Sequence, residues 1–292
     1  MWQSRTDREI VIAGALQDCA WSLERCSAGC WVCCAFTSPC AAHQVTVEMK
    51  DERWLDFDAP THSDTPLERV WQSLRLNGRL PGASKIALAR NNRSARVKAE
   101  IPLDDQIDVT TRIREACAGF DVALNSLGGS KFECIGDMPS AVVGEDKPSN
   151  LLQLCSETGW RFSERSGLLL LELDSGDSLR QAILQNEANG SVRVSVGLVS
   201  CGSWPVQNRY ALGALLLTAA GVVRFARPVA EQSDGQVTVG FEIKFATAPS
   251  PVELGHALAS LSVACQLCSR ETAAMQDEVI ANQYLKIRGW CS

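Results

Sequence analysis

The chain has 292 residues, of which 46% are hydrophobic and 21% are charged, and its formal net charge is −6. This composition is typical of a globular protein of about two domains, and the acidic balance argues against a nucleic-acid partner, because phosphate binding needs a basic surface. The longest apolar stretch, Ala211–Ala220, is too short to cross a bilayer, and the N-terminal residues hold no apolar run of signal-peptide length. Thirteen cysteines fit reduced thiols better than a secreted disulfide framework. We therefore expect a soluble, cytoplasmic protein without a membrane partner.

The first half of the chain predicts a mixed series of helices and strands. Apolar residues recur at helical spacing in the helical segments, and the strand segments are short apolar or alternating runs bounded by turn residues. The expected elements, in order, are a helix (Asp7–Arg25), three strands (30–36, 44–49 and 53–57), a helix (66–77), a hairpin of two strands (85–90 and 94–101) and a helix (109–124).

The second half repeats this order. Its apolar helix ends at a glycine, and an Asp-Gly pair lies in the turn of its hairpin. The expected elements are a helix from Ser149-Asn150, three strands (168–173, 179–184 and 192–199), a helix (208–220), a hairpin (222–227 and 236–245) and a helix from Ser250-Pro251 that continues, intact or broken, to Tyr284.

This repetition predicts an α+β protein of two tandem modules, each with the order α-β-β-β-α-β-β-α. Each module would be an antiparallel sheet with helices on one face, and a pseudo-two-fold axis would relate the two modules. The predicted boundaries are 1–127 for the first module, 128–148 for a linker, and 149–292 for the second module with a C-terminal helical extension. The apolar helix Tyr210–Ala220 is expected to meet its first-half counterpart between the modules. The chain would then be an intramolecular pseudo-dimer, and a monomer or weak dimer in solution.

The order of elements resembles the type III secretion chaperone-like fold, which is shared with the bacterial YbjN-like family. The second-half hairpin and the start of the next helix carry the likeness most clearly (Val237–Phe245 and Pro251–Leu254). The likeness rests on the order of the elements and involves no specific motif. It covers nearly the whole chain if the fold is matched once to each half. Secretion chaperones of this fold cradle an extended stretch of a client protein. The resemblance thus implies a non-enzymatic protein-binding or peptide-binding module of chaperone or adaptor type, although two copies in one chain depart from the family and no client-binding residue can be carried over.

A cluster of cysteines in the first half admits two interpretations. The spacing of Cys26, Cys30, Cys33 and Cys40 is one at which thiolates bind zinc or an iron–sulfur cluster. Against this, Cys33 and its neighbour Cys34 would point to opposite faces of a strand, and the matching strand of the second half holds leucines, so apolar packing suffices. We prefer packing, and a cysteine-ligated metal protein is the alternative.

No catalytic or nucleotide-binding motif is found. The sequence holds neither a Gly-x-Ser-x-Gly nor a Gly-x-Gly-x-x-Gly segment, and its three histidines (His43, His62 and His256) are scattered. We therefore expect no catalytic residue and no cofactor. The acids Asp56 and Asp58, and the short basic patch 93–98, are expected to be solvated surface.

The aromatic residues allow two roles. Eight tryptophans against two tyrosines are unusual, and Trp54, Phe57 and Trp204 lie in or beside predicted strands. Such rings pack cores or anchor protein interfaces. One hypothesis makes these three residues a protein-binding surface. The other is a purely structural or regulatory protein, in which the two halves only stabilise each other.

Overall fold

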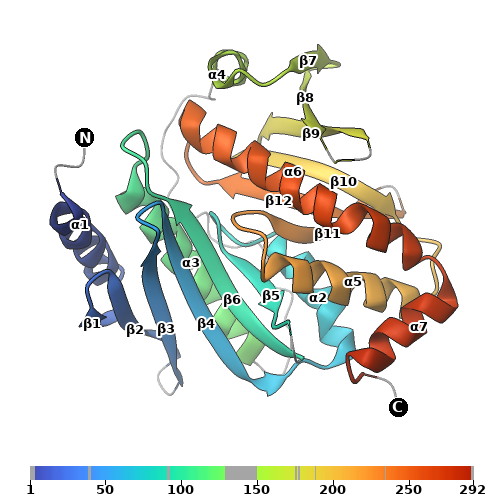
Figure 1. Ribbon diagram of the computed structural model, residues 1–292, viewed down its shortest axis with the longest axis horizontal. Coiled ribbons are helices and arrows are strands. Elements are labelled where there is room, and N and C mark those ends of the chain that lie inside the picture. The colour runs from blue at the N-terminus through green and yellow to red at the C-terminus, as the bar shows by residue number, and fades with distance from the viewer. Residues whose placement is uncertain are drawn as a thin grey trace.

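The computed structural model describes residues 4–38, 41–90, 93–128, 150–174, 176, 178–187, 189–233 and 235–290. Within these ranges the chain forms seven helices and two six-stranded antiparallel sheets (Figure 1). The elements of the first module are α1 (Arg5–Asp18), β1 (Ser22–Ser27), β2 (Cys30–Ser38), β3 (Ala41–Lys50), β4 (Trp54–Asp64), α2 (Leu67–Asn77), β5 (Lys85–Leu88), β6 (Ser94–Pro102) and α3 (Val109–Gly128). Those of the second module are α4 (Leu151–Thr158), β7 (Phe162–Arg165), β8 (Leu168–Asp174), β9 (Leu179–Asn186), β10 (Val192–Ser200), α5 (Val206–Ala220), β11 (Arg227–Ser233), β12 (Gln236–Phe245), α6 (Pro251–Ala274) and α7 (Glu278–Ile287).

The two sheets have the same topology. The strand order is β1-β2-β3-β4-β6-β5 in the first sheet and β7-β8-β9-β10-β12-β11 in the second. The predicted α+β class with two tandem sheet-and-helix modules is therefore confirmed. The predicted linker, 128–148, lies almost entirely outside the described residues.

Each module holds one strand more than predicted. The first helix ends at Asp18 and not at Arg25, because Ala20 takes a positive φ of 59° and the chain turns back to form β1 beside β2. The corresponding strand of the second module, β7, has only four residues and one apolar side chain, Phe162. Both are polar strands at a sheet edge, where the alternation that predicts a half-buried strand is weak.

The hairpin of the second module is shifted from its predicted position. The segment 222–226 was expected to start a strand, but it is a loop, and β11 begins at Arg227. Val223, Phe225 and Ala226 are nevertheless buried. They belong to the second core, and the ring of Phe225 meets those of Trp54 in the first module and Phe245 in the second.

The first core lies between the first sheet and two helices, α1 and α3, of which α3 runs along the back of the sheet (Figure 1). Inward-facing residues alternate along its strands, as Trp31, Cys33 and Ala35 do on β2. None of the helices in the described part of the chain is long and apolar enough to cross a membrane.

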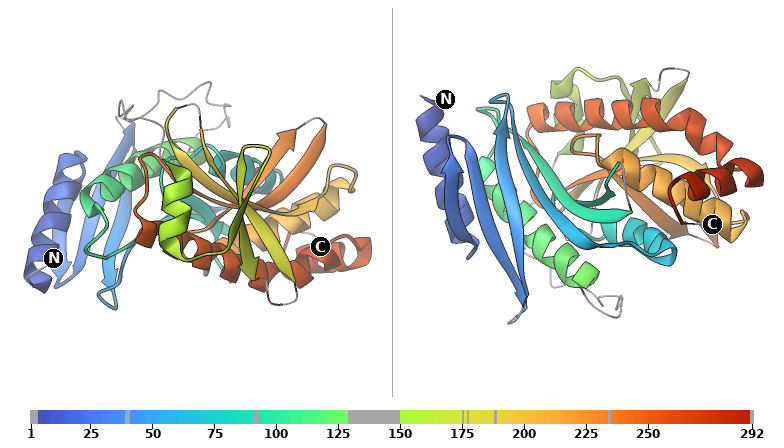
Figure 2. Two further views of the ribbon diagram at one scale, coloured as in Figure 1. Left: turned by 90° about the horizontal axis from the view of Figure 1, so that it is seen from above. Right: turned by 60° about the horizontal axis from the view of Figure 1, so that its bottom comes forward.

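The second core lies between the second sheet and α6, which runs along one face of that sheet (Figure 2). α6 begins with a capping box, in which Ser250 and Glu253 exchange hydrogen bonds. The predicted helix to Tyr284 is broken after Ala274, and Asp277 caps the new helix α7. This core also takes in Val70, Leu74 and Leu88 of the first module. The modules therefore share apolar packing.

Candidate functional site at the seam between the modules

The modules meet along a seam made by α2 and β5 of the first module, by α5 and β11 of the second, and by the loops 78–84 and 221–226. α2 packs on α5, as predicted for the most apolar helix. α2 also contacts β11, and α5 contacts β5. Because α2 and α5 are equivalent, as are β5 and β11, this reciprocal pattern is that of a two-fold interface built within one chain.

A buried lysine of the first module crosses the seam. Lys85, the first residue of β5, is fully buried, and its Nζ lies 2.8 Å from the carboxylate of Glu100 on β6. The same Nζ donates to the backbone carbonyl of Val223 in the loop 221–226. Glu100 in turn accepts the backbone N–H of Phe225 at 3.1 Å. Burial lowers the pKa of Lys85, and the nearby Glu100 carboxylate counteracts this shift.

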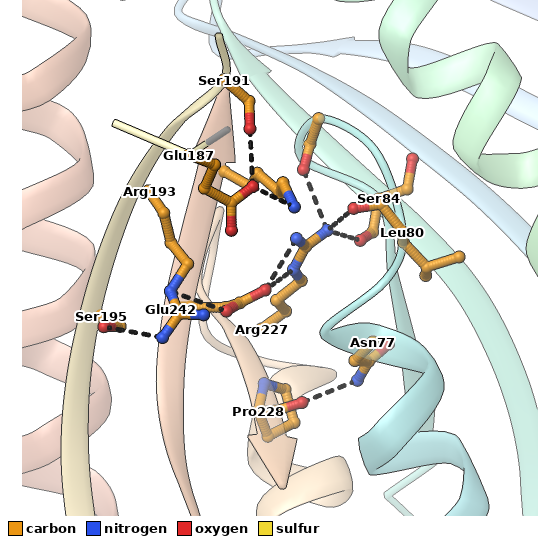
Figure 3. A network of polar contacts seen from close by, with 12 residues as sticks. Asn77, Leu80, Ser84, Glu187, Ser191, Arg193, Ser195, Arg227, Pro228 and Glu242 are labelled. Carbon is orange, nitrogen blue, oxygen red and sulfur yellow. Dashed lines mark hydrogen bonds and ion pairs between the residues drawn. The ribbon is translucent and has the colours of Figure 1, made fainter. Parts of the chain in front are cut away.

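A buried arginine of the second module makes the reciprocal crossing (Figure 3). Arg227, the first residue of β11, pairs with Glu242 on β12 at 2.8 Å. Its Nη1 donates to the carbonyls of Leu80, Gly82 and Ser84 in the loop 78–84, at 2.6, 3.1 and 3.2 Å. Burial raises the pKa of Glu242, against the opposing effect of Arg227. In each module, a residue of a buried ion pair thus donates hydrogen bonds to the loop of the other module.

Further polar side chains join the modules. The buried amide of Asn77, at the end of α2, donates to the carbonyl of Pro228 at 3.0 Å (Figure 3). Arg112 on α3 pairs with Glu253 at the start of α6, at 2.6 Å, and with Glu115 at 2.7 Å. These contacts leave few ways to dock the modules, since any other arrangement would bury unpaired charges.

The seam also contains a cluster of five residues from one strand, one helix and a loop, which we name the Trp54 cluster: Trp54, Asp56, Arg224, Phe225 and His256. Trp54 begins β4 and packs against the second core. Its ring meets those of Phe225 and His256 edge-on, at centroid distances of 6.3 and 5.5 Å. The Arg224 guanidinium lies 5.2 Å from the Trp54 ring centroid, in a cation–π arrangement.

The charged part of the Trp54 cluster reaches solvent. The side chain of Arg224 is 37% exposed and that of Asp56 is 23% exposed, and their charged groups are 3.8 Å apart. Burial raises the pKa of Asp56, the negative charge of Glu100 adds to this rise, and Arg224 counteracts it. Asp56 Oδ1 is buried and accepts no hydrogen bond from any residue that the structure describes. The cluster can therefore offer an aromatic ring, a cation and an unsatisfied carboxylate oxygen to a ligand.

Two expectations about charged residues were wrong at this site. Asp56 was expected to be solvated surface, but its Oδ1 is buried. Lys98 of the basic patch is only 19% exposed, because it pairs with Glu100 at 3.3 Å and donates to the carbonyl of Gly221 at 3.0 Å. The sequence carried no signal for either, since Arg224 and Gly221 lie more than 120 residues away along the chain.

The three aromatic residues predicted to form a surface occupy three different environments. Trp54 is half-buried at the seam, whereas Phe57 is fully buried in the first core, 5.9 Å from the ring of Phe120. Trp204 belongs to the second core and is 9% exposed. The structure therefore does not bring them onto one surface. His256 and Arg224, which no sequence pattern singled out, join Trp54 instead.

The cysteines proposed as metal ligands do not gather where the structure describes them. Cys33 is fully buried on the inner face of β2, and Cys30 is half-buried on the opposite face. The side chain of Cys26 and the residue Cys40 lie outside the described part of the structure. Among the described residues, no three His, Cys, Asp or Glu side chains group so that they could hold a metal ion.

The chain was compared with protein-family models, with curated proteins and with solved structures, and none matches it.

Proposed function

We propose that the protein is a non-enzymatic binding module of chaperone or adaptor type, and that its client is a peptide segment that docks at the Trp54 cluster. The observation that carries the proposal is a half-buried tryptophan ring with a guanidinium 5.2 Å from its centroid, beside a buried carboxylate oxygen without a partner. Tryptophan and arginine are enriched among the few residues that dominate binding energy at protein interfaces. A buried polar atom without a partner costs free energy that a ligand donor would recover.

The chemistry of the cluster indicates the kind of client. Asp56 Oδ1 would accept a hydrogen bond from a backbone N–H or a basic side chain, and Trp54 would contact an apolar side chain. The net charge of −6 favours a basic segment through long-range attraction. We therefore infer a peptide in which an apolar residue lies next to lysine or arginine.

Two further features support the proposal. The element order is similar to that of the secretion chaperone-like fold, although each module has one strand more than the order on which that resemblance rests. No disulfide joins the cysteines whose side chains the structure describes, which fits action in the reducing cytoplasm.

The test starts from selection of peptides on the intact protein from a random display library. The enriched peptides are then synthesised and titrated against the wild type, Trp54→Ala and Trp71→Ala. Trp71 is a matched control, because it is a half-buried tryptophan on α2 that also packs against the second core and has Arg209 6.0 Å from its ring centroid. We expect Trp54→Ala to weaken binding by about tenfold or more and Trp71→Ala by about twofold or less, because hot-spot truncation costs at least about 1–2 kcal/mol.

Equal effects of the two substitutions would contradict the proposed site. Failure to enrich any peptide that binds the wild type would contradict the function and favour a purely structural or regulatory role. Melting curves of both variants separate loss of binding from loss of folded protein.

A further inference from the structure

The last helix, α7, is fixed to both modules. Its inner face, which includes the fully buried Leu285, packs on α5 of the second module. The turn after the helix reaches the first module, where Arg288 donates to the carbonyl of Ala89 at 3.0 Å. The indole N–H of Trp290 donates to the carbonyl of Thr65, also at 3.0 Å. These contacts hold the opposite face of α7 in a defined position.

That outer face carries an apolar stripe that no described residue covers. Val279, Ile280 and Ile287 are 74%, 42% and 76% exposed, and Gln283 between them is exposed as well. Their spacings of three, four and seven residues place all four on one side of the helix. We name these four residues the α7 stripe. α7 lies at the margin of the molecule (Figures 1 and 2), so the stripe is open to a second folded protein.

The α7 stripe is self-complementary when one copy is turned end for end. Val279 and Ile287 lie four residues on either side of Gln283. In an antiparallel pair of α7 helices, Val279 of each copy would therefore meet Ile287 of the other, and Gln283 would meet its own copy. A carboxamide both donates and accepts hydrogen bonds, so the two glutamines can pair. Such reciprocity is that of an interface between identical chains about a two-fold axis.

The charges beside the stripe select the same orientation. Glu278, in the first turn of α7, and Lys286, in the last turn, lie along one edge of the stripe. Both are exposed, and neither forms an ion pair with a residue that the structure describes. In an antiparallel pair the same edges of the two helices face each other, so each Glu278 would approach the Lys286 of the other copy. A parallel pair would place like charges together.

We propose that the α7 stripe is a homodimer interface, at which two copies of this chain pack their α7 helices antiparallel about a two-fold axis at Gln283. Two ion pairs between Glu278 and Lys286 flank the apolar contact. Because α7 is already fixed on both modules, association costs little ordering of the backbone. The contact covers about two helical turns, which is small for a specific interface, so the dimer is weak and forms at high protein concentration.

Sedimentation velocity of the full-length protein, from about 1 μM to about 1 mM, tests the interface. We expect the wild type to change from monomer to dimer over this range. Ile287→Gln should weaken the dimer by about a hundredfold, because each dimer loses two buried isoleucines. Leu267→Gln is the matched control, since Leu267 is a 51% exposed leucine on the preceding helix, α6, and it should dimerise like the wild type.

Charge reversal tests the orientation and the identity of the partner. Glu278→Lys alone and Lys286→Glu alone should each weaken self-association, because like charges then face each other. An equimolar mixture of the two variants should dimerise again, since every flanking contact then joins a lysine to a glutamate. Absence of this rescue would contradict the antiparallel arrangement.

A wild type that stays monomeric up to about 1 mM would overturn the interface, as would a dimer that Ile287→Gln leaves unchanged. All substituted side chains are exposed, so the variants should keep the melting temperature of the wild type. The Trp54 cluster belongs to other elements, so the dimer and the proposed peptide site can succeed or fail independently.

Discussion

Lys85 and Arg227 hold equivalent positions in the two modules, and each donates to backbone carbonyls of the opposite module. Each is the first residue of the edge strand at the seam, and each is paired with a buried glutamate of its own sheet. Lys85 reaches the loop 221–226, and Arg227 reaches the loop 78–84. We infer that these reciprocal contacts select the docking of the modules, because a shifted arrangement would leave buried charges without partners.

Lys85→Met should lower the free energy of unfolding by about 3 kcal/mol, because it leaves the carboxylate of Glu100 buried without its closest cation. The double variant Lys85→Met/Glu100→Leu should recover a large part of that loss, since it removes the stranded charge as well. Chemical denaturation at pH 7 measures both values.

Arg114→Gln is the control for this experiment. Arg114 pairs with Asp18 at 2.9 Å, but both side chains are more than half exposed. Its loss should cost about 0–1 kcal/mol, the range of exposed ion pairs. A double variant that is no more stable than Lys85→Met alone would contradict the view that the stranded Glu100 charge causes the loss.

Two helical glycines should gain different amounts of stability on substitution by alanine. A Cβ at Gly213 on α5 would lie 3.0 Å from Val70 Cγ1 and 3.3 Å from Leu74 Cδ1 on α2, whereas a Cβ at Gly255 on α6 would meet nothing within 4 Å. Gly255→Ala should therefore raise the free energy of unfolding by about 1 kcal/mol through helix propensity. Gly213→Ala should gain less, and Gly213→Val should lose stability because α5 and α2 must move apart. Thermal and urea unfolding curves test this order, which an equal gain at both glycines would contradict.

Asp56→Asn should stabilise the protein at neutral pH. The folded state raises the pKa of Asp56, so the unfolded state releases this proton at lower pH than the folded state does. The wild type therefore loses stability as pH rises from the unfolded pKa, about 3.9, through the higher folded value. The asparagine variant lacks this loss, so its advantage should be absent in acid and full at pH 7. There it should reach about 1 kcal/mol, the low end of the cost of one unsatisfied buried polar group, because the Asp56 side chain is 23% exposed.

The neighbouring acid on the same strand provides the contrast. Asp58 is paired with Arg96 through two hydrogen bonds, one of them 2.9 Å long. Asp58→Asn should therefore cost about 0–1 kcal/mol at pH 7. Denaturation of both variants between pH 3 and pH 8 gives the comparison, and a gain for Asp56→Asn that does not change with pH would refute its cause.

The two modules should associate as separate chains. A fragment of residues 1–128 alone would expose Val70, Leu74 and Leu88, which belong to the second core. We expect it to aggregate or unfold by itself, and to form a one-to-one complex when co-expressed with residues 150–292. Size-exclusion chromatography with light scattering measures the complex. If the two fragments are stable monomers that do not associate, the shared core is contradicted.

Much of the architecture could be predicted because local patterns are strong in it. The apolar run of β8 and the capping box of α6 each involve only a few consecutive residues, so the sequence alone reveals them. The missed strands β1 and β7 are short, polar and at sheet edges, where neighbouring strands do not impose an apolar alternation. The misplaced β11 shows the opposite error: Val223 and Phe225 are buried in the second core although they lie in a loop, and no local pattern distinguishes this burial from that of a strand.

By itself the sequence determined the class, the repeat and the order of most elements, since hydrophobic periodicity and turn residues act over a few positions. It also pointed to Trp54, although not to the neighbours that surround it. Only the tertiary structure decided that Lys85 and Arg227 would be buried, and that Oδ1 of Asp56 would lack a hydrogen-bond partner among the described residues. Each of these results depends on segments roughly a hundred residues or more apart in the chain, which only the docking of helices and modules brings within contact distance.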